Sequence, residues 1–392
     1  MGRSQQTSER VAVFRMARII YALSGQGRGH TSRVIAITEA LRERGHEVRF
    51  CCGGTARDIL RGEGEEVIDV PALTQVMEGN QVQHGRTIAA NWDKVLNQPR
   101  IVSRLADEYR SFGPDLLITD FEAFSPKAAR KLGIPTISFN HQQVVTETRY
   151  HLPMREWGQA ALTAMAIRMI APKKPAHILL TSFFFPPLKH PEYTTLVGPI
   201  IRPDVQALTP TRGEHILVYY NQTEGAEHVL DTLRQVNASF IVYNFPTPEE
   251  PERYPNVQFK QPSLEGFLGD LAESRAVICT AGFTLISEGL YLGKPLLVVP
   301  NRGIFEQTIN ALFLERYGLG RAVMDRSLLP SDIQNFLSST GTYEQRQKGQ
   351  RRIGNEEALR CIENVLARLK PTATVRPTLP YETITETAER HP

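Results

Sequence analysis

The sequence of 392 residues lacks three features that would each point to a particular class of protein. It has only four cysteines, and they show neither the CxxC spacing of a zinc site nor a disulfide framework. No apolar run reaches the length of a membrane span, about 18–20 residues, and no signal peptide with a cleavage site is visible. Lys and Arg exceed Asp and Glu by only three, which gives no electrostatic reason to expect nucleic acid as a partner.

These absences favour a protein of the reducing cytoplasm. Hydrophobic residues make up 41% of the chain and charged residues 22%, which is the composition of a globular protein. Because single hydrophobic cores stop growing at about 250–300 residues, a chain of this length predicts two domains.

Short apolar runs alternate with helical patterns along the chain, twice over. ARIIYAL, EVRFCC, EEVIDV, DLLITD and PTISFN predict strands in the first half; HILVYY, ASFIVYNF, NVQFKQ, AVICT and PLLVVP do so in the second. We therefore expect two Rossmann-like parallel-sheet domains of the α/β class, facing each other across a cleft. The expected division is a flexible extension at 1–16, a first domain at 17–196, a proline-rich linker at 197–213, a second domain with a terminal helix at 214–371, and a flexible tail at 372–392.

A glycine-rich turn, SGQGRGH, follows the first predicted strand. Gly25, Gly27 and Gly29 can bring backbone N–H groups close to a ligand at the start of a helix. A dinucleotide site would also need an acidic residue at the end of the second strand, where Cys51 and Cys52 stand instead. A P-loop is excluded as well, because no GK[ST] follows the glycines.

His30 stands where this turn becomes a helix, and its imidazole is a candidate general base facing the cleft. The alternative is a histidine that merely hydrogen-bonds the turn. Asp120 ends the fourth predicted strand, which in a doubly wound sheet lies near the first, so its carboxylate can orient His30. The alternative for Asp120 is a helix N-cap before Ser125.

The segment from Ile278 to Gly320 resembles the nucleotide-sugar-binding signature of inverting GT-B glycosyltransferases. The families it resembles are the peptidoglycan GlcNAc-transferases and the UDP-glucuronosyl/glucosyltransferase superfamily. The matching positions are Gly282, Thr284, Ser287, Glu288, Gly293, Pro295, Pro300, Glu306, Gln307, Asn310 and Ala311. GQGRGH, PDLLITD with the following GIP, and VGPII agree with this resemblance, which extends from Ala17 to about Leu369.

The resemblance implies a UDP-sugar donor held by the second domain. Its expected donor-binding residues are Gly282, Phe283, Thr284, Glu288, Glu306, Gln307, Thr223 and Arg302. Residue chemistry agrees with it: a helix N-terminus after Gly282 favours a diphosphate, and a carboxylate such as Glu288 can accept two ribose hydroxyl hydrogen bonds.

By the same resemblance, His30 deprotonates an acceptor hydroxyl that displaces UDP with inversion, and neither a cofactor nor an obligatory metal is expected. The sequence departs from the family where Asn221–Gly225 replaces the usual glycine-serine phosphate loop, and where Thr280 replaces a histidine or basic residue. Arg302 or Arg28 is a candidate for the missing positive charge.

Acceptor recognition is expected to fall to the first domain. Gly27, Gly29, His141 and Gln142 are its candidate cleft residues, with loop capping as the alternative for the last two. Residues 154–174 (MREWGQAALTAMAIRMIAPKK) predict an apolar helix with basic edges, which packs on a core in the commoner case and lies on a membrane surface in the other. The charged run at 343–370 predicts a helix that packs back across the domains.

Two other functions share parts of this pattern. One is a UDP-GlcNAc 2-epimerase-like enzyme, which shares the architecture but uses carboxylates for its chemistry. The other is a non-catalytic sugar-nucleotide-binding protein, for which the missing phosphate loop argues. The sequence does not name the donor sugar or decide whether the acceptor is a small molecule, a glycan or a lipid. It leaves open a peripheral position at the inner membrane surface.

Overall fold

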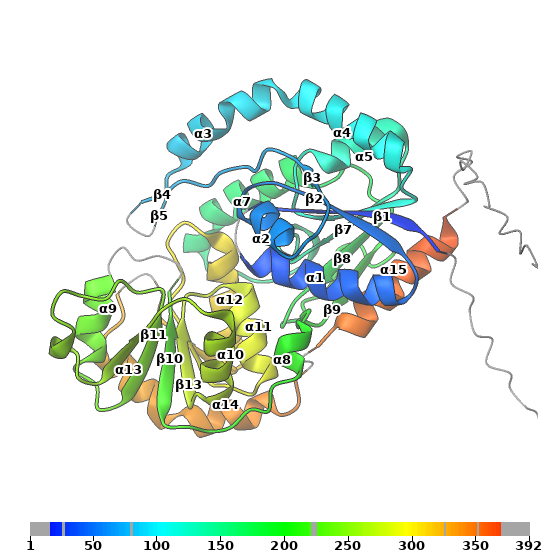
Figure 1. Cartoon of the computed structure of the whole chain (residues 1–392). Helices are drawn as coiled ribbons and strands as arrows, with labels where there is room; N and C mark the ends of the chain where they lie inside the picture. The colour runs from blue at the N-terminus through cyan, green and yellow to red at the C-terminus, as the bar shows by residue number, and fades with distance from the viewer. Residues whose placement is uncertain are drawn as a thin grey trace, which may run out of the picture.

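Two parallel sheets, each covered by helices, make up the computed structural model of this protein (Figure 1). It describes residues 16–25, 28–78, 81–220, 226–324, 327–350 and 353–369. The predicted α/β fold with two Rossmann-like parallel-sheet domains is confirmed. None of the helices within these ranges combines the length and apolar character that crossing a bilayer requires.

The strand order of both sheets reverses beside the first strand of each domain, as in doubly wound folds. Within the described residues the first sheet runs β3 (Val67–Asp69), β2 (Glu47–Cys52), β1 (Arg18–Leu23), β6 (Leu116–Asp120), β7 (Thr136–Asn140), β8 (His177–Thr181) and β9 (Thr194–Val197). The second runs β12 (Val257–Lys260), β11 (Ser239–Tyr243), β10 (His215–Tyr219), β13 (Ala276–Cys279), β14 (Leu296–Val298) and β15 (Gly320–Ala322). A short antiparallel pair, β4 (Met77–Glu78) and β5 (Gln81–Val82), lies apart from both.

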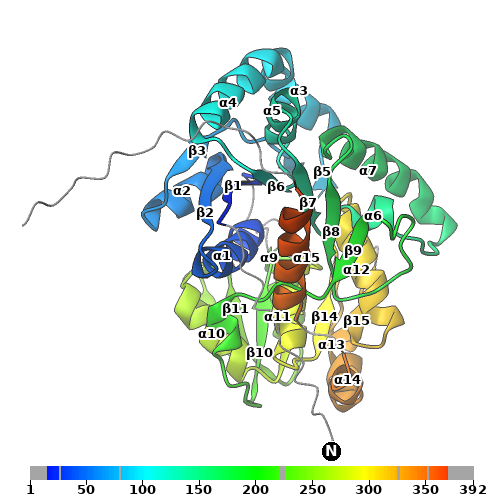
Figure 2. The same ribbon diagram turned by 90° about the vertical axis from the view of Figure 1, so that its right-hand side faces the viewer.

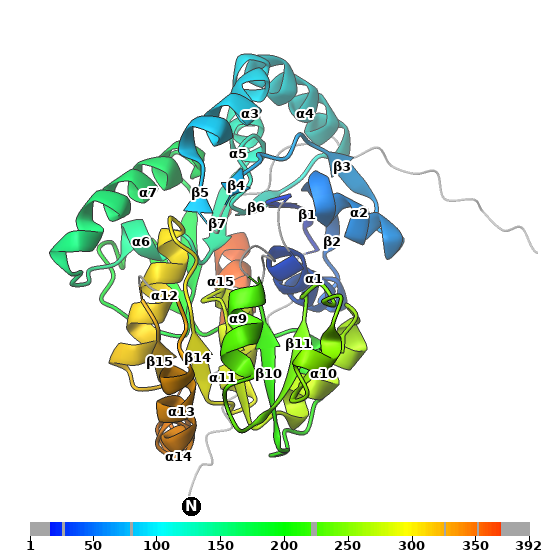
Figure 3. The ribbon, with the colours of Figure 1, turned by 90° about the vertical axis from the view of Figure 1, so that its left-hand side faces the viewer.

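Helices lie on both faces of each sheet (Figures 1–3). The first half of the chain contains α1 (Arg28–Glu43), α2 (Gly54–Gly62), α3 (His84–Leu96), α4 (Gln98–Phe112), α5 (Ser125–Leu132), α6 (Val144–Glu147), the 3₁₀ turn η1 (Met154–Glu156), α7 (Trp157–Ile170) and α8 (Pro203–Gln206). The second half contains α9 (Ala226–Leu233), η2 (Pro251–Arg253), α10 (Leu264–Glu273), α11 (Phe283–Tyr291), α12 (Phe305–Arg316), α13 (Pro330–Ser338), α14 (Thr340–Gln347) and α15 (Asn355–Arg368).

The strands form where the sequence is apolar almost without interruption, because both faces of each central strand are covered. β1, β6 and β7 are buried at nearly every position. β9 was not expected, since the sequence there reads as the start of a proline-rich linker. It pairs in parallel with β8 and extends the first sheet by one strand.

The last helix, α15, follows the second domain in sequence but packs on the first (Figure 2). Its apolar side chains Leu359 and Ile362 belong to the core cluster beneath α1 and β1. Glu363 approaches His46 of the first domain, with 2.9 Å between Oε1 and Nε2. The chain crosses between the domains beside Gly198, where an added Cβ would lie 2.8 Å from the carbonyl of Ile353. The terminal helix therefore ties the two domains together.

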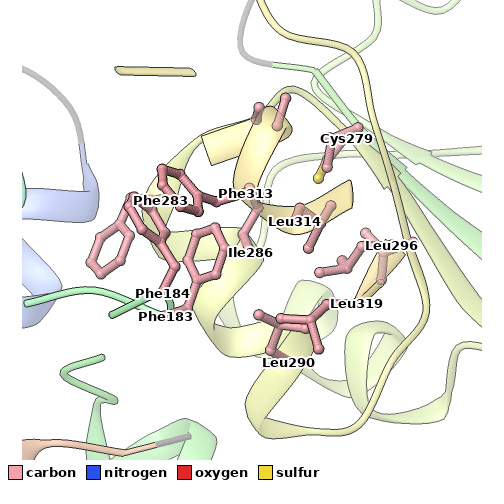
Figure 4. Packing of buried hydrophobic residues seen from close by; sticks show 14 of the residues in the cluster. Phe183, Phe184, Cys279, Phe283, Ile286, Leu290, Leu296, Phe313, Leu314 and Leu319 are labelled. Atoms are coloured by element: carbon pink, nitrogen blue, oxygen red, sulfur yellow. The ribbon is translucent and has the colours of Figure 1, made fainter. Parts of the chain in front are cut away.

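One apolar cluster continues from the first domain into the second. It joins side chains such as Phe184, from the loop after β8, to Phe283 of α11 and Phe313 of α12. Figure 4 shows these rings stacked at the contact between the two halves. Phe184 and Phe313 are parallel, with ring centroids 4.1 Å apart. Buried aromatic contacts of this kind stabilise the interface between the two domains.

Candidate functional site

His30 and Asp120 meet at the point where the strand order of the first sheet reverses. β1 pairs with β6 in parallel, and Leu23 at the end of β1 lies opposite Asp120. The chain turns away directly after Asp120, since Phe121 has a φ of 60°. His30 Nδ1 lies 3.0 Å from Asp120 Oδ1. The expected proximity of the two strands is thus confirmed, and the side chains are within hydrogen-bonding distance.

The partners of His30 favour one tautomer of its ring. An ionised carboxylate only accepts hydrogen bonds, so Nδ1–H donates to Asp120 and Nε2 keeps its lone pair. The Gln142 side-chain amide lies 3.4 Å from Nε2 and can donate to it. The His30 side chain is 18% exposed, whereas Asp120 is fully buried. This tautomer is the one a general base requires.

Arg33 is a third member of this cluster, one turn along α1 from His30. Its Nε and Nη2 both donate to Asp120 Oδ2, at 3.1 and 2.6 Å. Nη2 also lies 3.1 Å from His30 Nδ1, but both atoms are donors in this tautomer, so this contact is not a hydrogen bond. Burial raises the pKa of Asp120, but the charges and hydrogen bonds of Arg33 and His30 oppose this, and the net pKa is below the usual range. Asp120 is therefore held as a carboxylate.

His141 connects the two domains beside this cluster. It is buried, its Nδ1–H donates to the Thr181 carbonyl over 2.8 Å, and its Nε2 lies 2.8 Å from Oδ1 of Asn310 in α12. Its ring stacks on Phe283 of α11 with centroids 3.9 Å apart. Burial lowers the pKa of His141 despite the nearby charge of Glu306, so the ring is favoured in its neutral form.

The start of α11 faces the first domain. Gly282 precedes the helix and has no side chain to cap it, which leaves the first-turn N–H groups without a side-chain acceptor of its own. Thr284 is half-buried, and Phe283 is buried between His141 and Arg33, whose guanidinium carbon lies 5.9 Å from the ring centroid. The helix end is thus an uncapped, positively polarised terminus close to Arg33.

Glu288 lies in α11 and is buried, so it is not a solvent-facing helix acid. Its carboxylate forms an ion pair with Arg202 of the linker: Oε2 accepts a hydrogen bond from Nη2 at 3.0 Å, and Oε1 lies 2.9 Å from Nε. Its side chain is only 4% exposed. Burial raises the pKa of Glu288, and Arg202 offsets that rise only in part. A ribose contact at this position remains a prediction.

The remaining donor candidates lie at the start of α12 and in the loop before it. Glu306 is half-buried in the first helical turn, whereas Gln307 is buried and its Oε1 accepts from the Asn301 N–H at 2.8 Å. Arg302 is exposed. Gly29 lies in the first turn of α1. Two candidates, Thr223 and Gly27, fall outside the described residues.

Sequence reasoning missed Arg33 and Arg202. Arg33 stands three residues after His30 in α1, and only its burial and its contact with Asp120 reveal its role. Arg202 is separated from Glu288 by 86 positions, and a proline-rich linker carries no signal of such a pairing.

Comparisons with known proteins show the family of the chain. The model of Glycosyl transferase family 1 matches residues 17–340. An uncharacterized glycosyltransferase from Methanosarcina mazei is 25% identical over 331 residues, which span 78% of this chain and 85% of that protein. The UDP-N-acetylglucosamine–N-acetylmuramyl-(pentapeptide) pyrophosphoryl-undecaprenol N-acetylglucosamine transferase of Rhizobium etli is 24% identical over 347 residues, 82% of this chain and 86% of its own.

Solved structures show the same fold at lower identity. The glycotransferase of kitacinnamycin superposes with a TM-score of 0.66 at 18% identity, over 90% of this chain and 99% of its own. CalG4, the calicheamicin glycosyltransferase, gives 0.64 at 18% identity, over 91% and 100%. MurG of Acinetobacter baumannii gives 0.60 at 14% identity, over 89% and 99%. With the family model covering most of its length, this chain belongs to glycosyl transferase family 1 and is a glycosyltransferase of the GT-B type.

Proposed function

We propose that this glycosyltransferase is an inverting hexosyltransferase that moves a sugar from a UDP-linked donor to an acceptor hydroxyl, with His30 as general base. The observation that carries the proposal is the cluster of His30, Asp120 and Arg33. Asp120 fixes the ring with its Nε2 lone pair free to take a proton, and Arg33 keeps Asp120 ionised. Membership of the family argues against the epimerase alternative.

In the proposed reaction, Nε2 of His30 removes the proton of the acceptor hydroxyl as its oxygen attacks the anomeric carbon. The bond from that carbon to the diphosphate oxygen breaks on the opposite face, and UDP leaves with the bonding electron pair. No covalent intermediate forms, and no metal is required. The uncapped N-terminus of α11 is suited to the charge that develops on the diphosphate, because its N–H groups and dipole are already oriented.

The donor is proposed to lie against the second domain. Glu306 and Gln307 at the start of α12 are assigned to the sugar hydroxyls, and Gly282 with Thr284 to the diphosphate. Glu288 is assigned to the ribose, which requires the ribose to reach a carboxylate that already accepts from Arg202. UDP is favoured because the Rhizobium relatives are named for a UDP-sugar, and because UGT2 of Phytolacca americana was solved with UDP-2fluoro-glucose.

The acceptor is proposed to bind the first domain, where the Gln142 side chain lies beside His30. The printed names of relatives span two acceptor classes, a pyrophosphoryl-undecaprenol lipid and the small molecule calicheamicin. A lipid-linked acceptor would suit an enzyme working at the cytoplasmic membrane surface, which is the location we propose.

The test is to incubate the protein with a panel of UDP-sugars and acceptors, and to follow released UDP and glycosylated product. Wild-type protein should release UDP in step with product, and His30→Ala should lower kcat by about 10²–10⁴-fold, the contribution of a positioned base. UDP affinity, measured by calorimetry, should not change. His190→Ala is the matched control, since this histidine is exposed on the same domain. Unchanged transfer by His30→Ala would remove His30 from the reaction.

A further inference from the structure

The helix α7 is apolar on both its inner and its outer face, although only the inner face packs on the core. Its inner face is buried through Ile167, with Ala160 and Ala164 against the shared core cluster. Its outer face exposes large apolar side chains, namely Trp157 (61%), Leu162 (56%), Met165 (54%) and Met169 (63%). Trp157, Met165 and Met169 stand on one side of the helix, at multiples of four residues. A contiguous exposed patch of this kind marks an interaction surface.

A cavity with cationic walls opens beside this helix. It has a volume of about 780 Å³ and lies between the loops after β7 and β8 in the first domain and the last turns of α12 in the second. Arg149, Lys189 and Arg316 are among the lining residues, and none of the lining residues is an aspartate or glutamate. Tyr150, Phe313 and Tyr317 give it aromatic walls. The lining segment ends at His151, three residues before η1 and α7 begin.

Two of these cations donate hydrogen bonds to neutral backbone carbonyls. Lys189 Nζ donates to the Thr146 carbonyl at 2.6 Å, and Arg316 Nη2 donates to the His151 carbonyl at 3.1 Å. Glu147 acts on Lys189 electrostatically, but burial outweighs it and lowers the pKa of Lys189. Neutral carbonyls orient a cation without neutralising it, so the cavity retains a positive potential that attracts anions.

Further basic residues extend this charge along α7. Arg168 is exposed within the helix, and Lys173 and Lys174 are exposed directly after it. Figure 3 shows α7 at the outer edge of the first domain, beside α6 and above α12. An apolar helical face bordered by cations is the arrangement that binds at the surface of an anionic bilayer.

We propose that the outer face of α7 and the adjacent cationic cavity form a docking surface for a membrane of anionic phospholipid. Trp157, Leu162, Met165 and Met169 enter the boundary between headgroups and acyl chains, and Arg149, Lys189 and Arg316 bind headgroup phosphates. This surface differs from the site around His30, so its test is independent of the proposed reaction.

The two tryptophans of the chain provide a direct test. Trp92 lies on α3 and Trp157 on α7, and both are exposed. Trp92→Phe leaves Trp157 as the only reporter, and Trp157→Phe leaves Trp92. Vesicles of phosphatidylcholine with phosphatidylglycerol should shift Trp157 emission to the blue, and brominated acyl chains should quench it. Trp92 emission should change much less. Quenching of Trp92 with Trp157 unaffected would place the membrane contact on α3 and overturn the proposal.

Charge and apolar variants separate the two parts of the surface. Arg149→Glu with Arg316→Glu should lower vesicle affinity in sedimentation by about tenfold or more, since each basic residue near an anionic surface contributes about 1 kcal/mol. Leu162→Ser with Met165→Ser and Met169→Ser should abolish the quenching. The matched controls are Arg234→Glu with Arg253→Glu, and Leu264→Ser, all exposed in the second domain. Three results would contradict the proposal. They are equal binding to vesicles of phosphatidylcholine alone, equal losses of binding in the control variants, and variants that lose self-association of the protein while vesicle binding is unchanged.

Discussion

Asp120 in the first domain and Glu288 in the second are both buried carboxylates that meet an arginine, yet their pKa values move in opposite directions. Burial raises the pKa of both groups. Arg33 and His30 more than offset this effect at Asp120, whereas Arg202 offsets it only in part at Glu288. The number of positive and hydrogen-bonding partners therefore decides the outcome, and Asp120 is the carboxylate equipped to support a base.

Removing the charge of Asp120 should have the largest effect on catalysis. Asp120→Asn keeps the size of the side chain but faces Arg33 and His30 with a neutral amide, so the ring loses the partner that fixes its tautomer. We expect kcat to fall by about 10²–10⁴-fold while UDP affinity stays unchanged. Glu288→Gln should not reproduce this loss of kcat. Equal effects of the two variants on kcat would break the distinction between the carboxylates.

Removing Arg202 should have the largest effect on stability. Arg202→Ala leaves Glu288 buried without its counter-charge, which should cost about 3 kcal/mol of unfolding free energy in urea denaturation.

Calorimetry of UDP binding to Glu288→Ala separates the two possible roles of Glu288. A ribose contact predicts weaker UDP binding by a folded variant, and unchanged affinity would leave Glu288 with a structural role alone.

Replacing Arg33 should lower kcat less than replacing Asp120. Arg33→Met leaves Asp120 with His30 as its remaining side-chain partner, so the pKa of Asp120 should rise, as burial alone would raise it. We expect kcat to fall by about tenfold and the acid limb of the pH–rate profile to move to higher pH. A variant that loses activity without any change in the profile would show that Arg33 acts only on packing.

The smallest effect concerns the pH dependence of stability through His141. Its folded-state pKa is lowered, so the unfolded chain binds more protons below about pH 6.5, and stability should fall as pH falls from there toward the lowered pKa. The raised pKa of Glu288 acts in the opposite direction, because protonation relieves a buried charge. Comparing urea midpoints of wild type and His141→Asn across this range isolates His141, and identical slopes would contradict its assignment.

Much of this arrangement could be predicted from sequence because local patterns determine it. The apolar runs ARIIYAL and DLLITD predict β1 and β6, and their adjacency in a doubly wound sheet brings His30 to Asp120. The contacts of Arg33 and Arg202 could not be predicted in this way. Arg33 lies 87 residues from Asp120, and Arg202 lies 86 residues from Glu288. Local sequence patterns do not predict buried pairs that are this far apart in the chain.

The contacts between the two domains could not be predicted from the sequence either. His141 was expected in the cleft, but not its stacking on Phe283 or its approach to Asn310 across 169 residues. The helix at 154–174 was expected to pack on a core in the commoner case, and the structure shows that it does so with one face while the other stays exposed. Which face of an apolar helix is covered depends on the neighbouring elements, not on its own sequence.

The stereochemistry of the product tests the central claim most directly. An enzyme in which His30 activates the acceptor for a single displacement must invert the anomeric carbon, so an α-linked UDP-sugar should give a β-linked product in an early-time proton NMR spectrum. A product with the α-linkage retained would contradict the account, because a single displacement cannot produce it.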